Sequence, residues 1–341
     1  YLYASNATSQ TQIVADTTDS TVAITSLKYA TTYFWYVVAK EDGDQIAISN
    51  IWSFTTSDLP DNRLLFGREV NGNYQVFSSS LEGQNISQLT TTPARNWNPS
   101  MSTVLNRIAF TSNRGSDFQI FHMNRDGSDL SQTTTLAVAG YHNNGLGYCW
   151  SPNGNGFLYS HYDKLYYIDK DGTGQVSIKD TAPAGRNWRE VDWNGITRKI
   201  VDQATGVNIY DSEIYLMNAD GSNLQLLVPN DPGRTDHPVL SADGTKMLFS
   251  HDAQGFDSQN GRQLDARIYL MDLATMNITD ISINKPPGTN DLMPEFSPNN
   301  AKVIFVNEDN TGAGLQEVYE MDIDGTDRQV ILTDAYMPAT R

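Results

Sequence analysis

The chain repeats one pattern six times: an apolar strand, a short spacer, and a second strand that ends in an acidic or Asn residue, usually before an Asp-Gly turn. The repeat period is roughly 44 to 53 residues, and a period of this length with strand-type alternation is typical of β-propeller arrays. The sequence therefore predicts an all-β fold. The second strands begin at Gln75, Gln119, Lys164, Glu213, Arg267 and Glu317.

An inner strand and its hairpin also recur, and five copies align without gaps. They begin at Asn98, Gly147, Glu190, His237 and Met293. The first repeat enters at Arg63 without such a strand, and the missing copy is found in residues 336–340. Because an open ring leaves unpaired edge strands, we expect residues 62–341 to form a six-bladed β-propeller of four-stranded antiparallel blades, closed by the C-terminal strand.

Residues 1–57 have a different pattern, with short alternating strands. Leu27 precedes Tyr33, which opens an aromatic and β-branched run. This segment resembles the later strands of a fibronectin type III domain, and the Leu27/Tyr33 spacing resembles that family's tyrosine corner. We expect a partial β-sandwich of low stability by itself, followed by a linker at residues 58–61. Because Tyr1 to Ala4 resemble the middle of a strand, we expect the natural protein to extend further toward its N-terminus.

Several repeated motifs resemble a known propeller family. Ser-Pro-Asn-Gly at residues 151–154, Ser-Ala-Asp-Gly at 241–244 and the run from Ile214 to Gly221 are similar to the TolB-like propellers of the bacterial cell envelope, also seen in tricorn-type and prolyl-oligopeptidase-type peptidases. The resemblance covers residues 62–341. It implies an exported bacterial protein that is periplasmic, outer-membrane-associated or secreted. The matching residues are those that build blades, so function must be argued from other residues.

Composition excludes some partners. The chain has 40 Asp and Glu against 23 Lys and Arg, a net charge of −17, whereas nucleic acids and anionic membrane surfaces require a basic footprint. No apolar run is long enough for a membrane helix, so we expect no membrane insertion. We also expect the protein to be a monomer. The single cysteine, Cys149, lies in an apolar strand and is interpreted as a buried small hydrophobe.

Loops that vary over a rigid scaffold usually carry binding. In propeller geometry one face carries the connections between blades, which here are long and individual: residues 91–97, 136–146, 181–189, 229–236 and 284–292, with the largest insertion at 251–266. Two of these loops share the tripeptide Arg-Asn-Trp. The candidate ligand-binding residues on this face are Arg95, Trp97, Tyr141, His142, Arg186, Trp188, Arg234, His237, His251 and Asp291.

The Arg-Asn-Trp pair allows two interpretations. Arg is suited to bidentate capture of a carboxylate, and Trp offers a flat plate for a sugar ring or a cation. Alternatively, Trp97 and Trp188 plug between adjacent blades while the arginines pair with the protein's own carboxylates.

Metal binding is a further hypothesis. Asp236, His237 and Asp291 enter inner strands, where polar side chains would ring the channel mouth and could hold a cation or simply water. Oxygen-rich ligands favour Ca²⁺, whereas histidine would favour zinc or manganese. The Asp-x-Asp-Gly segments are interpreted as hairpin turns, because their Gly is fourth rather than sixth as in an EF-hand loop.

Catalysis is the alternative to simple binding. His142, His161 and Tyr162 lie on loops bounding one blade, and β-elimination needs a His or Tyr base with an Arg, here Arg186, to neutralise a uronate carboxylate. This set is similar to that of oligogalacturonate and ulvan lyases. The sequence contains no Gly-x-Ser-x-Gly elbow, the motif that would indicate a serine hydrolase. The sequence favours a non-catalytic propeller that binds a glycan or protein partner, with a lyase acting on a uronate-containing glycan as the alternative.

Overall fold

The computed structural model describes residues 1–5, 7–14, 17–24, 27–102, 104–231, 233–254, 256–257, 262–312 and 314–340. The chain divides into two compact units, Tyr1–Asp61 and Asn62–Arg341. The regular elements in these ranges are all β-strands. None of the described residues belongs to a helix long and apolar enough to cross a membrane.

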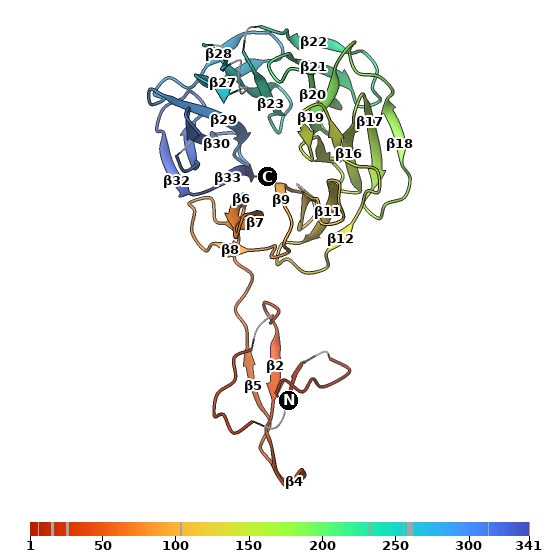
Figure 1. Cartoon of the computed structure of the whole chain (residues 1–341), viewed down its shortest axis with the longest axis vertical. Helices are drawn as coiled ribbons and strands as arrows, with labels where there is room; N and C mark the ends of the chain where they lie inside the picture. Colours follow the sequence, from red (N-terminus) through yellow and green to blue (C-terminus); the bar gives the residue numbers. More distant parts are fainter. Residues whose placement is uncertain are drawn as a thin grey trace. The chain divides into compact units, whose positions relative to one another are not determined.

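The second unit is a ring of antiparallel sheets, and each sheet has an inner strand that lies nearest the centre of the ring (Figure 1). From inner to outer strand they are β33 (Tyr336–Thr340), β6 (Leu64–Val70), β7 (Asn73–Ser79) and β8 (Ser87–Gln88); β9 (Asn96–Met101), β10 (Arg107–Ser112), β11 (Gln119–Asn124) and β12 (Ser131–Gln132); β15 (Tyr148–Trp150), β16 (Gly156–His161), β17 (Lys164–Asp169) and β18 (Val176–Lys179); β19 (Asn187–Asn194), β20 (Lys199–Thr205), β21 (Ser212–Asn218) and β22 (Gln225–Val228); β23 (Thr235–Leu240), β24 (Lys246–Asp252), β27 (Ala266–Asp272) and β28 (Ile278–Asp280); β29 (Thr289–Phe296), β30 (Lys302–Asp309), β31 (Glu317–Asp322) and β32 (Gln329–Thr333).

Short strands are added at two of the connections. β13 (Ala139–Gly140) and β14 (Asn143–Asn144) extend the sheet of β16, with β13 parallel to it. β25 (Phe256–Asp257) and β26 (Arg262–Gln263) pair within the insertion expected at 251–266. Residues 255 and 258–261 of that insertion lie outside the described residues.

The C-terminal strand β33 is the innermost strand of the first sheet. It pairs antiparallel with β6, with Tyr336 opposite Gly67 and Ala339 opposite Leu65. Met337 and Ala339 are buried. The segment that the repeat alignment assigned to this position therefore supplies the inner strand that β6 would otherwise lack.

The hydrophobic core lies between neighbouring sheets. Alternate residues of a strand point to opposite faces. Along β20, Ile200 and Ala204 join a buried cluster with Trp188, whereas Val201 joins the next cluster with Phe249. Because both faces of a sheet are covered in this way, each fully buried large apolar side chain contributes about 1.5–3 kcal/mol to stability.

The recurring Asp-Gly segments are hairpin turns. In one of them Asp220 Oδ1 accepts hydrogen bonds from the backbone N–H of Ser222 at 3.0 Å and from its hydroxyl at 2.6 Å. Gly221 follows with φ of 77°, and a Cβ there would lie 2.0 Å from the carbonyl oxygen of Ile178. The turn requires glycine, and the aspartate is engaged by its own backbone.

The first unit is smaller and simpler. It contains the sheet β1 (Leu2–Ala4), β2 (Thr32–Trp35) and β5 (Trp52–Thr55), and a hairpin of β3 (Val38–Glu41) and β4 (Asp44–Ile48). Tyr33 is buried, and its hydroxyl oxygen accepts a hydrogen bond of 2.9 Å from the backbone N–H of Lys28. A tyrosine corner has this kind of local contact between a Tyr hydroxyl and upstream backbone.

Candidate functional site

The inner strands carry bulges at matching positions. Asn98, His237, Met293 and Met337 each precede a proline and have φ between 48° and 56°. The pairing register with the second strand shifts at each of these places. Bulges re-aim side chains, and left-handed conformations at non-glycine residues frequently mark functional positions.

These inner strands enclose a cavity of about 70 Å³ at the centre of the ring. That volume admits several water molecules or the end of one side chain. The third residue of every aligned inner segment lines it: Ser100, Cys149, Asp192, Val239, Glu295 and Ala339. The cavity is therefore built from one repeated position, and its chemistry is decided by the side chain that each blade places there.

One wall of the cavity is charged and joins three sheets. His237 Nδ1 lies 3.5 Å from Glu190 Oε2, and His237 Nε2 lies 3.8 Å from Glu295 Oε1. The backbone N–H of His237 also donates to Glu190 at 2.6 Å. Burial by itself lowers the pKa of His237, but the two carboxylates outweigh it and raise the pKa to about 10. The imidazole is therefore protonated at neutral pH.

Arg189 anchors this wall from behind. Its side chain is buried, and Nη1 lies 2.8 Å from Glu190 Oε1 and 2.6 Å from Asp236 Oδ1. Its Nε donates to the carbonyl oxygen of His142 at 3.1 Å. Burial raises the pKa of Glu190, but Arg189 and His237 overcome that effect and lower it. Removing one member would leave a buried charge unpaired and should therefore strongly destabilise the fold.

The opposite wall is neutral. Asn98 donates through Nδ2 to the carbonyl oxygen of Leu146 at 2.9 Å, and the Tyr148 hydroxyl donates to the carbonyl oxygen of Asn98 at 2.7 Å. Met337, Pro338 and Ala339 complete this side. The cavity is thus two-sided, with ionised groups on β19, β23 and β29 facing uncharged groups on the other inner strands.

Comparison of the sequence with known families gives no match to a family model and no match to a curated protein. The fold does have solved counterparts. TolB from Acinetobacter baumannii is 13% identical, with a TM-score of 0.65 over 92% of this chain and 80% of that one. Putative TolB from Agrobacterium tumefaciens is 16% identical, with a TM-score of 0.57 over 80% of this chain and 90% of that one.

The fold is a TolB-like β-propeller. A chain of the nidogen/laminin complex, 12% identical with a TM-score of 0.60 over 82% of this chain and 97% of that one, shares the propeller architecture. At these identities the likeness shows the fold alone. It agrees with the resemblance seen in the Ser-Pro-Asn-Gly and Asp-Gly motifs.

The TolB-like propeller buries one of the two tryptophans expected to bind a ligand. Trp188 is fully buried and packs edge-on against Tyr215. The prediction that Trp188 contacts a ligand is wrong, because its indole fills the space between blades. Trp97 is partly exposed, but it stacks on Phe118 at 5.4 Å, and the Arg95 guanidinium lies 4.6 Å from its ring centroid.

The residues proposed for a lyase are engaged by other parts of the propeller. Arg186 pairs with Asp211 at 2.6 Å and with Glu213 at 3.3 Å. His142 Nε2 lies 2.8 Å from the carbonyl oxygen of Val207, and His161 Nδ1 lies 2.8 Å from that of Ala137. Arg186, the arginine predicted to neutralise a uronate carboxylate, is therefore paired with two carboxylates of the protein itself. Tyr141 and Tyr162 are exposed.

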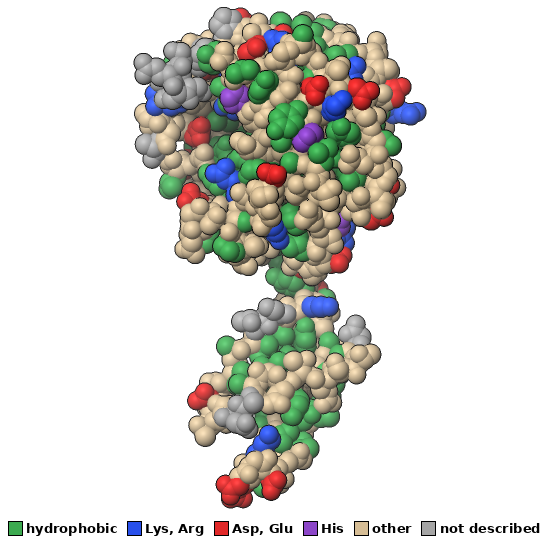
Figure 2. All heavy atoms as spheres, turned by 45° about the vertical axis from the view of Figure 1, so that its right-hand side comes forward, with side chains coloured by type: hydrophobic (Ala, Val, Ile, Leu, Met, Phe, Trp, Pro, Cys, Tyr) green, Lys and Arg blue, Asp and Glu red, His purple; other side chains and the backbone are tan. Residues whose placement is uncertain are grey.

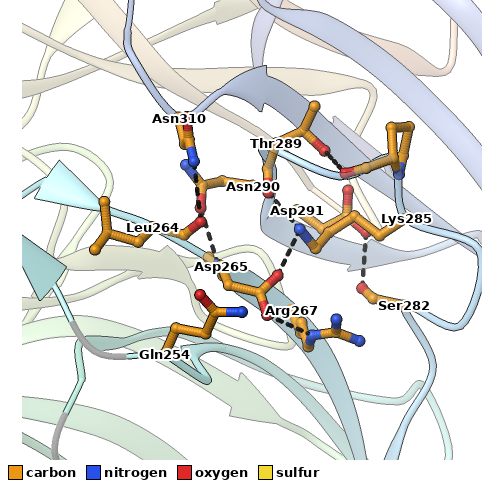
Figure 3. A network of polar contacts seen from close by, with 12 residues as sticks. Gln254, Leu264, Asp265, Arg267, Ser282, Lys285, Thr289, Asn290, Asp291 and Asn310 are labelled. Atoms are coloured by element: carbon orange, nitrogen blue, oxygen red, sulfur yellow. Dashed lines mark hydrogen bonds and ion pairs between the residues drawn. The ribbon is translucent and has the colours of Figure 1, made fainter.

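The metal candidates do not come together. Asp291 is fully buried, and its two oxygens each lie 2.7 Å from Arg328. It also accepts from the Ser282 hydroxyl, beside the network in which Lys285 and Arg267 pair with Asp265 (Figure 3). The described residues include no group of three or more His, Cys, Asp or Glu arranged to hold a metal ion. The predicted grouping of Asp236, His237 and Asp291 is therefore corrected to two separate ion-pair clusters.

Two other residues that were predicted to bind a ligand, Arg234 and His251, lie beside the charged wall of the cavity. Arg234 pairs with the second oxygen of Asp236. His251 Nδ1 lies 2.8 Å from the Thr235 hydroxyl, and burial lowers the pKa of His251.

On the face of the molecule that Figure 2 shows, acidic and basic side chains are interspersed rather than gathered into a basic stripe.

Sequence reasoning missed Arg189, Glu190, Asp192 and Glu295. A signal for three of them was available. Glu190 occupies the first and Asp192 and Glu295 the third position of the aligned inner segments, and in a strand these two positions share a face.

Proposed function

We propose that this chain is a non-catalytic, protein-binding propeller of six blades, from an exported or envelope-associated bacterial protein, accompanied by a partial fibronectin type III unit. It engages its partner through the face that carries the connections between blades. The observation that carries this proposal is the two-sided cavity at the ring centre, where the charged wall is fixed in ion pairs.

The ionisation of that wall favours recognition over catalysis. A general acid or base works best with a pKa near the working pH. The pKa of His237 is raised to about 10, and the pKa of Glu190 is lowered. Both groups hold a fixed charge across the neutral range. They therefore supply a constant electrostatic pattern, which a partner can complement.

A protein partner fits the exposed surface better than a glycan does. Trp188 is buried, and Trp97 is engaged by Arg95 and Phe118. By contrast Tyr141 is 40% exposed and Tyr162 is 52% exposed, and tyrosine is enriched in protein interfaces. Structural counterparts include TolB proteins and a chain from a complex between nidogen and laminin, which supports protein binding as the general use of such a ring.

The test is site-specific photo-crosslinking in the living cell. A photoreactive residue replaces Tyr141 or Tyr162 on the proposed face, or Ile196 in a turn of the opposite face, where it is also exposed. We expect a discrete crosslinked protein from positions 141 and 162 and none from 196. Equal crosslinking from both faces, or none from either, contradicts the proposal.

A further inference from the structure

Glu295 is an incompletely paired carboxylate in the cavity. Its side chain is only 16% exposed, and among the described residues its one ion pair is with His237 Nε2 at 3.8 Å. That imidazole is shared with Glu190, which lies closer at 3.5 Å and also binds Arg189. A carboxylate has about four acceptor sites, so Glu295 retains capacity for a further donor.

The cavity as a whole carries excess negative charge. Its lining contains the carboxylates of Glu190, Asp192 and Glu295 and one imidazolium, His237. The lining therefore holds more carboxylates than cations, with Arg189 paired to Glu190 from behind. A cationic group entering the cavity would meet a favourable potential, strengthened by the surrounding low-dielectric walls.

The wall opposite the carboxylates favours a cation that carries an aliphatic chain. Met337, Pro338 and Pro99 provide apolar surface, along which a methylene chain can lie while its charged end reaches the carboxylates. The cavity volume of about 70 Å³ suits a compact head group. The described residues offer no three-ligand grouping for a metal ion.

We propose that the cavity binds a primary ammonium group at the end of an aliphatic stem, namely a lysine side chain presented by the protein partner. This inference rests on the proposed function, since it names the chemistry of the partner at the same site. The ammonium donates to Glu295, and its remaining donors face Asp192 and the rest of the acidic wall. Its stem lies against the Met337 side.

The probe is n-butylammonium, which reproduces the lysine side chain, titrated into the full chain and followed by NMR. We expect saturable binding that weakens about tenfold or more in Glu295→Gln, because a hydrogen bond to a charged group is lost. The matched control is Glu320→Gln, on a carboxylate that pairs with Lys302 at 3.0 Å outside the cavity. That variant should bind as the wild type does.

Three parallel titrations define the ligand class. n-Butanol should bind at least tenfold more weakly, n-propylguanidinium should bind more weakly than n-butylammonium, and Ca²⁺ should not displace the amine. Equal binding of butanol overturns the inference, because it would mean that the cavity is only an apolar slot. Displacement by Ca²⁺ or preference for guanidinium overturns it in favour of a metal or arginine.

A second variant covers the case in which Glu295→Gln does not fold. Ser100→Lys places an ammonium within the cavity lining, and we expect it to abolish n-butylammonium binding while Ser100→Ala retains it. Unchanged probe binding in Ser100→Lys overturns the inference.

Crosslinking separates this inference from the proposed function. If crosslinks from positions 141 and 162 persist in a Glu295→Gln protein that no longer binds the amine, the lysine inference falls and protein binding stands. If the amine binds but neither face crosslinks, the proposed function falls instead.

Discussion

The two units of this chain use similar residues and achieve different degrees of burial. In Asn62–Arg341 each sheet covers its neighbours, and its large apolar side chains fill clusters such as that of Leu65, Phe110 and Met123. In Tyr1–Asp61, by contrast, Ile46 is 61% exposed and Ile51 is 59% exposed. The difference shows that a strand-forming sequence is not sufficient for a stable fold, because a sheet gains most of its stability when its apolar face is covered by another element.

Cross-strand aromatic pairs partly compensate in the first unit. Tyr33 stacks on Phe54 at 5.6 Å, and Trp35 lies 4.7 Å from Trp52. Such pairs contribute roughly 0.2–1 kcal/mol each, whereas a fully buried large apolar side chain contributes about 1.5–3 kcal/mol. The ring should therefore dominate the stability of the chain.

Separating the two units should give the largest difference in thermal stability. We expect residues 62–341 alone to unfold cooperatively at the temperature of the whole chain, and residues 1–61 alone to show no cooperative transition, because few of their apolar side chains are buried. Calorimetry of the three proteins checks this. A sharp transition in residues 1–61 would show that the stacked aromatic pairs stabilise that unit more than burial suggests.

Removing the closing strand should have the next largest effect. Deletion of residues 335–341 leaves β6 without its inner neighbour and removes the buried Met337 and Ala339. We expect the melting temperature to fall by about 10 °C or more, as measured by circular dichroism. The control is Asp334→Asn, an exposed neighbour whose ion pair with Arg68 is long at 3.7 Å and should matter little. An unchanged melt in the deletion would contradict ring closure.

Within the ring, losing one partner of a buried ion pair should lower the free energy of unfolding more than losing one partner of a surface pair. Asp291→Ala leaves Arg328 buried without its carboxylate and should cost about 3–5 kcal/mol of unfolding free energy. Lys246→Ala, which removes an exposed pair of 3.9 Å with Asp272, should cost less than about 1 kcal/mol. Urea denaturation measures both. Comparable losses would mean that burial does not govern these pairs.

The last comparison concerns two histidines whose pKa values shift in opposite directions. Burial, together with the nearby Arg107 charge, lowers the pKa of His122 despite a hydrogen bond to the Lys170 carbonyl, so its contribution is present above pH 6.5 and lost as pH falls below it. The pKa of His237 is raised to about 10, so its contribution is complete below pH 6.5 and lost as pH rises toward 10.

Unfolding free energies from pH 5 to 9.5 test these directions. His237→Asn, which suits the left-handed backbone there, should remove the alkaline loss, and His122→Gln should remove the acidic loss. The two variants should therefore flatten opposite limbs of the wild-type profile. If both flatten the same limb, one of the assigned directions is wrong.

The fold was predictable because its signals are local. Strand alternation and Asp-Gly turns recur in each repeat, and alignment of the copies located the strand at 336–340. The partners of individual side chains were not predictable in the same way. Asp291 was assigned to a channel mouth, but the folded blade brings it against Arg328, 37 residues later. The role of Arg189 could not be predicted because it depends on Asp236 in the next blade, 47 residues away.

The position of β33 also determines when the first blade can be completed during synthesis. β6 (Leu64–Val70) is made early, but its inner neighbour exists only after residues 336–340 have been added. At about 5–20 residues per second this delay is roughly tens of seconds. During that interval β6 is the exposed edge of an incomplete sheet. The first blade to be synthesised is thus the last to be finished, and until then its unpaired edge can pair with other chains.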